Sequence, residues 1–177
     1  MGLRGSAKRV IFLACLVSAP LVLAGCPKSR SVDPGAGGEA GGAAVSAVGF
    51  ALESLSGKRV ELSAYRGRQV LVHFWASWCP PCLPELPQIL AFASKMQAKD
   101  WVVLAVSTDT DWGKVRAALP AKESIPSNFI VLLDPDSKVA EAYGSYMYPE
   151  SYWVNAAGRI ERKWVGPQPW EQISGSL

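Results

Sequence analysis

The stretch QVLVHFWASWCPPCLPELPQILAFASKMQ, Gln69 to Gln97, sets the fold class of this chain. Its first part, Gln69–Ala76, is almost wholly apolar, which is typical of a strand buried on both faces of a sheet. Its last part, Leu83–Gln97, has apolar residues at the spacing of an amphipathic helix. Two cysteines, Cys79 and Cys82, lie between these parts. The stretch therefore predicts a strand, a CxxC pair and a helix in direct succession.

The rest of the folded part alternates in the same way. Apolar stretches predict strands, and periodic stretches between them predict short helices. The strands are expected at residues 101–108, 129–134, 151–155 and 159–166, and the helices at 112–119 and 138–144. This order predicts an α/β domain with a mixed central sheet and helices on both faces.

Three turns and caps can be placed from local residue types. Residues 50–67 predict two short strands around a Ser56-Gly57 turn. Ser63 is expected to cap a helical turn that follows these strands. Asp109 or Asp111 is expected to cap the helix at 112–119.

Composition and charge indicate a single globular domain without a nucleic-acid partner. The chain has 177 residues, of which 49% are hydrophobic and 19% are charged. Its formal charge is +3, but Arg4, Lys8 and Arg9 belong to an N-terminal segment that resembles a removable leader. Without these three, the 18 Lys and Arg residues fall to 15, equal to the 15 Asp and Glu residues. A near-neutral chain with no basic patch does not fit nucleic-acid binding.

The N-terminal residues predict export and a lipid anchor. Residues 1–25 are expected to be a signal peptide, because the apolar run Val10–Ala24 follows basic residues and is shorter than the roughly 20 residues of a membrane span. An uncleaved N-terminal anchor is the alternative. Leu23–Cys26 resembles the lipobox of bacterial lipoproteins, which implies acylation of Cys26. Residues 26–48 are rich in Gly and Ala and predict a flexible tether, so that the folded domain is expected at 49–177.

The cysteine count argues against two other uses of the CxxC pair. Cys15 leaves with the signal peptide and Cys26 is acylated, so that Cys79 and Cys82 are the remaining thiols. A disulfide-stabilised secreted domain has several well-separated pairs, which this chain lacks. A zinc site needs three or four protein ligands, whereas the mature chain offers two thiols and His73, which is expected to pack inside its strand. We therefore predict no metal site and no cofactor.

Redox chemistry fits the position of the two thiols. Cys79 is expected at the entrance of the helix, where unpaired backbone N–H groups and the helix dipole stabilise a thiolate. Pro80 and Pro81 suit the first helical turn because their missing N–H groups need no partner there. Cys82, one turn further on, is expected to be more buried and to act as the resolving thiol.

A family resemblance extends this interpretation. The stretch FWASWCPPCLPELP, with LLDPDSKVAEAYG and PESYWVNAAGRI further along, is similar to the TlpA/ResA/DsbE family of extracytoplasmic thiol–disulfide oxidoreductases. The resemblance runs from Phe50 to Trp170. It implies a thioredoxin-like fold with an N-terminal β-hairpin extension, an attacking Cys79 and a resolving Cys82. It also implies that Pro149 follows a cis peptide bond and faces the two thiols.

Other residues around the pair have expected roles in substrate binding. Trp78 is expected to be exposed as an apolar contact for partner chains, with Pro80, Pro81 and Tyr148 beside it. Members of the resembling family usually have a small or β-branched residue directly before the cis-proline. Because Tyr148 is larger, it is expected to narrow the substrate groove. Trp75, inside the strand, is expected in the core.

Glu85 has two alternative interpretations. In the ResA-like branch an acid at this position lies beside the thiols, where it can accept a proton from Cys82 or tune the pKa of that thiol. Alternatively, Glu85 is an ordinary solvated helix residue. Glu150, directly after Pro149, resembles the pattern of the cytochrome c maturation branch.

The sequence thus predicts a membrane-tethered oxidoreductase on the periplasmic side of a bacterial membrane. Its expected partners are exported proteins with disulfides, with apocytochrome c as one candidate, and a membrane thiol-electron carrier as donor. The alternatives are a copper-handling chaperone, a peroxiredoxin-like peroxidase and a non-catalytic interaction domain. The first lacks a histidine after His73, the second has Ser77-Trp78 where a threonine is expected, and the third does not explain the intact CPPC pair. The direction of electron flow, the substrate and the membrane leaflet stay open.

Overall fold

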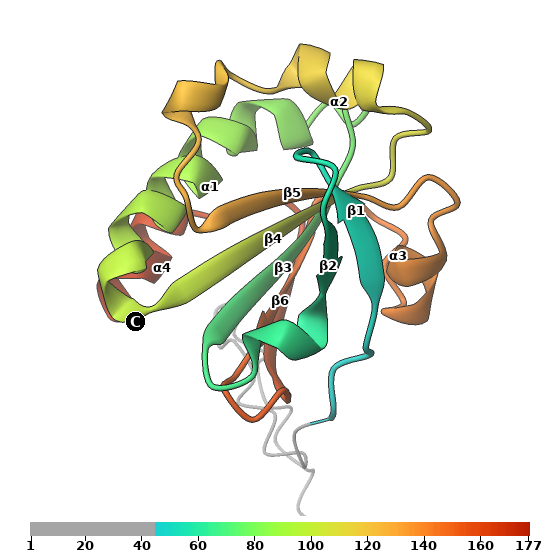
Figure 1. The fold of residues 1–177 in the computed structure, drawn as a ribbon. Helices are drawn as coiled ribbons and strands as arrows, with labels where there is room; N and C mark the ends of the chain where they lie inside the picture. The colour runs from blue at the N-terminus through green and yellow to red at the C-terminus, as the bar shows by residue number, and fades with distance from the viewer. Residues whose placement is uncertain (1–44) are drawn as a thin grey trace, which may run out of the picture. The chain divides into compact units, whose positions relative to one another are not determined.

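The computed structural model describes residues 45–177. The predicted signal peptide, Cys26 and most of the predicted tether lie outside the described residues. The described chain forms a seven-stranded mixed sheet with the strand order β2-β1-β5-β4-β3-β6-β7 (Figure 1). The predicted α/β fold, with a mixed sheet and an N-terminal hairpin, is therefore confirmed.

The elements lie close to the predicted positions. The strands are β1 Ala51–Ser54, β2 Arg59–Glu61, β3 Gln69–Trp75, β4 Trp101–Ser107, β5 Phe129–Leu133, β6 Glu150–Val154 and β7 Ile160–Val165. The helices are α1 Cys82–Met96, α2 Trp112–Ala118, α3 Lys138–Ala142 and α4 Trp170–Ser176, with 3-10 turns η1 Leu62–Tyr65, η2 Gln97–Lys99 and η3 Lys122–Ser124. Strands β3, β4 and β5 are parallel, and the hairpins β1–β2 and β6–β7 extend the sheet on its two sides.

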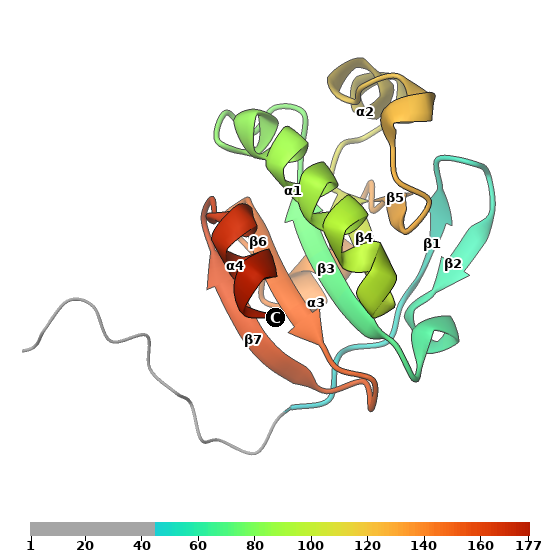
Figure 2. The same cartoon turned by 90° about the vertical axis from the view of Figure 1, so that its left-hand side faces the viewer.

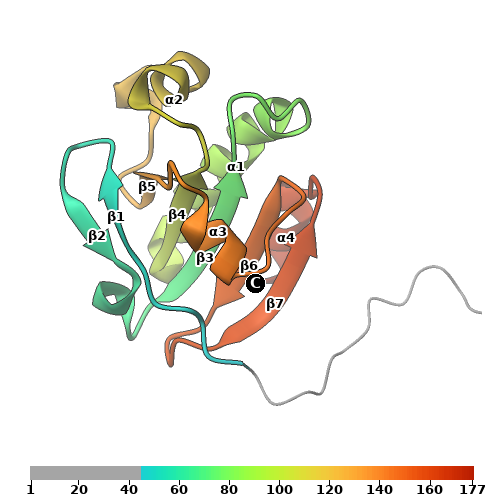
Figure 3. The ribbon, with the colours of Figure 1, turned by 90° about the vertical axis from the view of Figure 1, so that its right-hand side faces the viewer.

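Helices cover both faces of the sheet. Helices α1 and α4 lie side by side on one face, and α3 lies on the other (Figures 2 and 3). Successive strand side chains point to opposite faces, which explains why β3 and β4 are apolar along their whole length. Leu71 and Trp75 of β3 pack under α1, whereas Val72 and Phe74 pack on the α3 face.

The hydrogen-bonded chain begins a few residues before the expected domain boundary at residue 49. Ser46 forms an isolated antiparallel bridge with Arg159. The backbone N–H of Ala47 donates to Gly158 O at 3.0 Å, and the N–H of Ile160 donates to Val45 O at 2.8 Å. The end of the predicted tether is therefore attached beside the start of β7, a contact that Gly- and Ala-rich composition does not reveal.

One of the two predicted helix caps is confirmed, and the other is wrong. Asp111 caps α2, since its carboxylate accepts from the N–H groups of Gly113 and Lys114. Asp109 does not cap this helix; its side chain is buried and turns back toward the CxxC loop. Ser63 does not cap η1, because its hydroxyl donates to the Glu61 carboxylate instead.

Between residues 45 and 177, every helix is too short or too polar to cross a membrane.

Candidate active site

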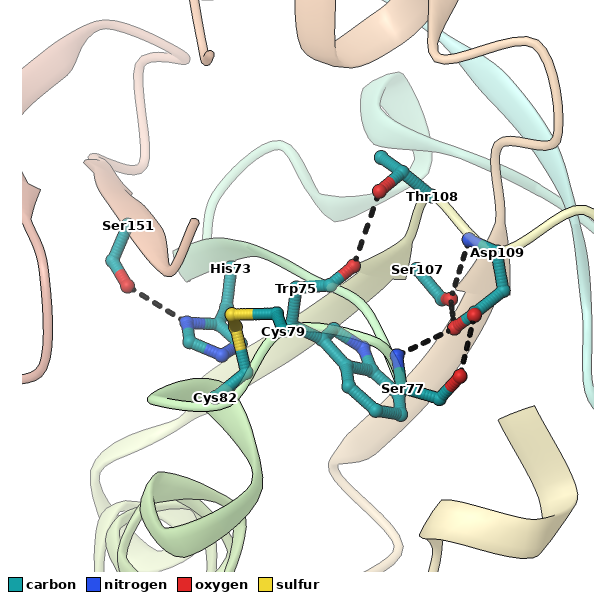
Figure 4. The surroundings of a disulfide bond; sticks show 9 residues. All are labelled: His73, Trp75, Ser77, Cys79, Cys82, Ser107, Thr108, Asp109 and Ser151. Carbon is teal, nitrogen blue, oxygen red and sulfur yellow. Dashed lines mark hydrogen bonds between the residues drawn. A yellow bond between two sulfur atoms is a disulfide. The ribbon is translucent and has the colours of Figure 1, made fainter. Parts of the chain in front are cut away.

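A disulfide joins the loop after β3 to the first residue of α1. Cys79 and Cys82 are bonded, and their Cα atoms are 5.3 Å apart (Figure 4). The loop Ala76–Cys79 is held by a hydrogen bond from the Cys79 N–H to Ala76 O, and the Cys82 N–H donates to Cys79 O. Cys82 is fully buried and Cys79 is 3% exposed, which is the predicted order of accessibility. The loop and the first turn of α1 thus hold the two cysteines at the separation that a disulfide requires.

Contrary to the prediction from the sequence, the prolines between the cysteines do not form the first helical turn. Helix α1 begins at Cys82, so that Pro80 and Pro81 precede the helix and Pro81 is its N-cap. Pro84 is the third helical residue, where an N–H would have no partner in the helix. The position of the helix start thereby explains how α1 tolerates Pro84. Pro87 lies inside α1 and removes one helical hydrogen bond.

The loop before β6 faces the same end of the sheet. The peptide bond between Tyr148 and Pro149 is cis, the isomer that the sequence predicted for Pro149. The Tyr148 ring packs edge-on against the Trp78 indole, with ring centroids 5.8 Å apart. Trp78 is 60% exposed, as expected, while Trp75 is buried in the core. The predicted substrate-binding residues Trp78 and Tyr148 are therefore in contact across the mouth of the site.

Glu85 is buried, so that the interpretation as a solvated helix residue is wrong. One carboxylate oxygen accepts from the Gln168 N–H at 2.9 Å and from the Trp170 indole N–H at 2.6 Å. The other oxygen has no partner among the described residues. Burial raises the pKa of Glu85, and these two hydrogen bonds lower it in part. Glu85 lies three residues after Cys82 on α1, a spacing that puts two side chains about 5–6 Å apart on a helix.

His73 is a packed strand residue, as expected. Its Nδ1 lies 2.9 Å from the Ser151 hydroxyl, and its ring packs edge-on against Trp170. Complete burial lowers the pKa of His73 to about 3, so that the ring is neutral at physiological pH. Within residues 45–177, no three His, Cys, Asp or Glu side chains gather as metal ligands do.

Several residues of the site were not found from the sequence. Asp109 was considered only as a helix cap, yet its carboxylate binds the loop that carries Cys79 (Figure 4). Gln168 and Trp170 bind Glu85 from the segment before α4 and from α4 itself. The sequence carried one signal for Asp109, its position directly after a buried strand. In a parallel sheet, a residue at this position lies beside the end of the neighbouring strand.

A cysteine pair set between a buried parallel strand and a helix, in a chain that also has a cis-proline directly before β6, is typical of thioredoxin-fold thiol–disulfide oxidoreductases. The chain is an enzyme of this class, as its relatives are. Residues 44–163 match the profile of the AhpC/TSA family, and the chain belongs to that family.

Named relatives and solved structures agree with this class. The thiol-disulfide oxidoreductase ResA of Bacillus subtilis (strain 168) is 31% identical over 118 residues, which cover 66% of this chain and 64% of the relative. ResA of Bacillus anthracis is 28% identical over 128 residues, which cover 72% of each chain. The crystal structure of StoA from Bacillus subtilis has a TM-score of 0.61 and 26% identity, covering 73% of this chain and 96% of that one. The pneumococcal exposed lipoprotein thioredoxin Etrx1 from Streptococcus pneumoniae strain TIGR4 has a TM-score of 0.61 and 31% identity, covering 73% and 100%. The predicted likeness to ResA-type oxidoreductases is confirmed.

Proposed function

We propose that this oxidoreductase is held on the outer side of a bacterial membrane by lipid on Cys26 and reduces disulfides in exported proteins. Apocytochrome c is one candidate substrate. The observation that carries the proposal is the Cys79–Cys82 disulfide at the entrance of α1, next to the exposed Trp78. The lipobox at Leu23–Cys26 supports the anchor, as does the likeness to the pneumococcal exposed lipoprotein thioredoxin.

Reduction proceeds in two exchanges. The Cys79 thiolate attacks one sulfur of a substrate disulfide, a mixed disulfide forms, and the other substrate sulfur leaves as a thiolate that takes up a proton. The Cys82 sulfur then attacks Cys79, which releases the second substrate thiol and closes the Cys79–Cys82 disulfide. Two electrons and two protons pass from the cysteine pair to the substrate. An external dithiol donor, for which we propose a membrane thiol-electron carrier, restores the reduced pair.

Glu85 is proposed as the proton acceptor for the second exchange. Cys82 is completely buried, so that its proton needs an acceptor inside the protein. Glu85 is close to Cys82 on α1 and has one oxygen without a hydrogen-bond partner among the described residues. The pKa of Glu85 is raised and is therefore closer to the pKa of a thiol, which makes proton transfer between the two groups easier.

The surface around the disulfide fits an apolar substrate segment. Most of the large exposed apolar side chains between residues 45 and 177 belong to the loop after β3, the start of α1, the cis-proline loop and the end of β7: Trp78, Leu83, Tyr146, Met147 and Val165. Leu83 follows Cys82, and Tyr146 and Met147 lead into the cis-proline loop. Val165 is paired with Glu150, and the next N–H, that of Gly166, donates to Pro149 O at 2.8 Å. An apolar surface of this kind supports binding of an unfolded chain whose cysteines lie among hydrophobic residues.

Insulin reduction by the full chain tests this function. The reduced protein is expected to reduce insulin disulfides, whereas Cys79→Ser lowers the rate by about 10³-fold or more because the nucleophile is gone. Cys82→Ser is expected to accumulate the mixed disulfide at Cys79, which mass spectrometry detects. An active Cys79→Ser variant, or a mixed disulfide at Cys82 alone, contradicts the assigned roles.

Two further assays separate the alternative functions. A peroxide-consumption assay tests the peroxidase alternative, for which membership of the AhpC/TSA family gives a specific reason. A copper titration of the reduced protein tests the metal-handling alternative.

Mass spectrometry of the N-terminus tests the anchor, since an intact Met1 without a lipid on Cys26 rejects it.

A further inference from the structure

The end of β4 carries a buried carboxylate that binds the redox loop. Asp109 is completely buried, two residues beyond the last residue of β4. Its oxygens accept from the Ser77 N–H at 2.8 Å, from the Ser77 hydroxyl at 2.6 Å and from the Ser107 hydroxyl at 2.7 Å (Figure 4). Two of these three bonds go to the residue that lies two positions before Cys79.

These bonds extend the β3–β4 ladder past the point where the strands end. The last paired residues are Trp75 and Ser107, and the Thr108 N–H still donates to Trp75 O at 3.0 Å. One step further, the chain of Ser77 has left the sheet and meets the Asp109 carboxylate instead of a backbone carbonyl. The carboxylate therefore replaces a ladder partner at the place where the strand becomes the redox loop.

The side-chain oxygens of Asp109 are hydrogen-bonded by neutral donors. None of the ion pairs formed within residues 45–177 includes Asp109. A buried carboxylate needs such hydrogen bonds, and they are strong because the acceptor is charged. The loop between Trp75 and Cys79 is thus attached to the end of β4 by bonds that involve neither α1 nor the disulfide.

We propose that Asp109 is a positioning residue for thiol–disulfide exchange, holding the Ser77–Trp78 turn so that the Cys79 sulfur and the Trp78 indole keep one arrangement toward an incoming disulfide. This inference rests on the attacking role proposed for Cys79. In the reduced state the S–S bond no longer joins Cys79 to Cys82, so that the loop depends on its hydrogen bonds, among which those to Asp109 are the ones that reach a neighbouring strand. A nucleophile needs alignment with the two sulfurs of its target, and a displacement of the loop slows the attack.

The test follows the reactivity of Cys79 in the full chain with Cys82→Ser as background. The probes are oxidised glutathione, which measures exchange, and iodoacetamide over a pH series, with peptide mapping to isolate the signal of Cys79. Asp109→Ala is expected to slow exchange by about tenfold or more, because the loop loses its restraint. Asp109→Asn is expected to stay within about threefold of the parent, since an amide can accept from the Ser77 N–H and donate to the Ser77 hydroxyl.

A matched control separates positioning from general loss of stability. Asn128 is also buried and joins two segments, but at the opposite end of β4, where its amide donates to Ala93 O and Trp101 O. Asn128→Ala is expected to lower stability and to leave Cys79 exchange unchanged at a temperature where the variant is folded. Ser77→Ala keeps the backbone bond to Asp109 and is expected to slow exchange by about twofold to threefold.

Three results overturn the proposal. The first is a folded Asp109→Ala variant whose exchange rate and pH profile match those of the parent. The second is an Asp109→Asn variant as slow as Asp109→Ala, which assigns the effect to charge. The third is equal slowing in Asn128→Ala. If Asp109→Ala does not fold, the double variant Ser77→Ala with Ser107→Ala takes its place, and an unchanged rate there also rejects the proposal.

The unsubstituted protein distinguishes failure of the proposed function from failure of this inference. If the unsubstituted protein does not reduce insulin, the proposed substrate class fails. Alkylation of Cys79 and exchange with glutathione still report on the role of Asp109 in that case.

Discussion

The two ends of the parallel strands β3, β4 and β5 use similar buried polar side chains for different purposes. At the amino end, the Asn128 amide joins α1 to β4, and the Trp153 indole N–H donates to the Gln69 side chain at 2.6 Å. At the carboxyl end, Asp109 and Glu85 bind segments that surround the cysteine pair. The polar side chains at the amino end join neighbouring elements of the fold, whereas those at the carboxyl end surround the Cys79–Cys82 disulfide, beside the exposed ring of Trp78.

The difference lies in what is exposed. In the described chain, each end has a buried polar atom without a hydrogen-bond partner, Asn128 Oδ1 at the amino end and Glu85 Oε2 at the carboxyl end, but Trp78 at the carboxyl end keeps most of its indole in solvent. An exposed aromatic ring beside a reactive bond suits contact with a partner chain and contributes little to stability. Changes at the amino end should therefore alter stability without altering redox chemistry, whereas changes at the carboxyl end should alter redox chemistry.

The largest expected effect is on stability, at the amino end. Asn128→Ala is expected to lower the free energy of unfolding by about 2 kcal/mol, since two carbonyls lose a buried donor. Urea unfolding followed by circular dichroism measures this change, and insulin reduction at 10 °C serves as the redox readout. A large loss of specific activity in the folded variant breaks the contrast between the two ends.

The next effect concerns Glu85 and has opposite signs for stability and rate. The pKa of Glu85 is raised in the folded protein, so that its contribution to stability is present below the ordinary value of 4.5 and is lost as pH rises through the raised value. Glu85→Gln removes this loss and keeps an oxygen that accepts from Gln168 and Trp170. The variant is expected to be more stable than the parent at pH 8, yet to resolve mixed disulfides about tenfold more slowly because the proton acceptor is missing.

Stopped-flow measurement of the second exchange across pH, together with urea unfolding at pH 5 and pH 8, checks both signs. Leu86, the next residue on α1, offers an apolar control as Leu86→Met, which leaves the carboxylate in place. A resolving step with the same pH profile in Glu85→Gln and parent removes Glu85 from the reaction.

The smallest expected effect concerns the exposed indole. Trp78→Ala is expected to raise the KM for insulin by about three- to tenfold through loss of apolar contact, with little change in stability. The rate at which iodoacetamide modifies Cys79 is expected to change less than KM does. If the KM for insulin and the rate of Cys79 modification change equally, Trp78 orders the loop and does not bind substrate. Val165→Ala, which removes another exposed apolar side chain, provides a comparison.

Much of the fold follows from local pattern. The unbroken apolar run before the CxxC pair and the periodic run after it identify β3 and α1, since burial on two faces and helical spacing are properties of neighbouring residues. The exposed Trp78 and the packed His73 follow from their positions in the same stretch. The burial of Glu85 does not, because Glu85 is one of few polar residues in a helix and could equally face solvent.

The sequence by itself determined the strand–CxxC–helix unit and the short loop that brings two sulfurs together. Tertiary structure alone decided which polar groups surround that unit. Ser77 meets a residue 32 positions away, and Glu85 meets partners 83 and 85 positions away. The physical reason is that local periodicity encodes which face of an element is apolar, whereas the partner of a buried polar atom depends on how distant elements pack.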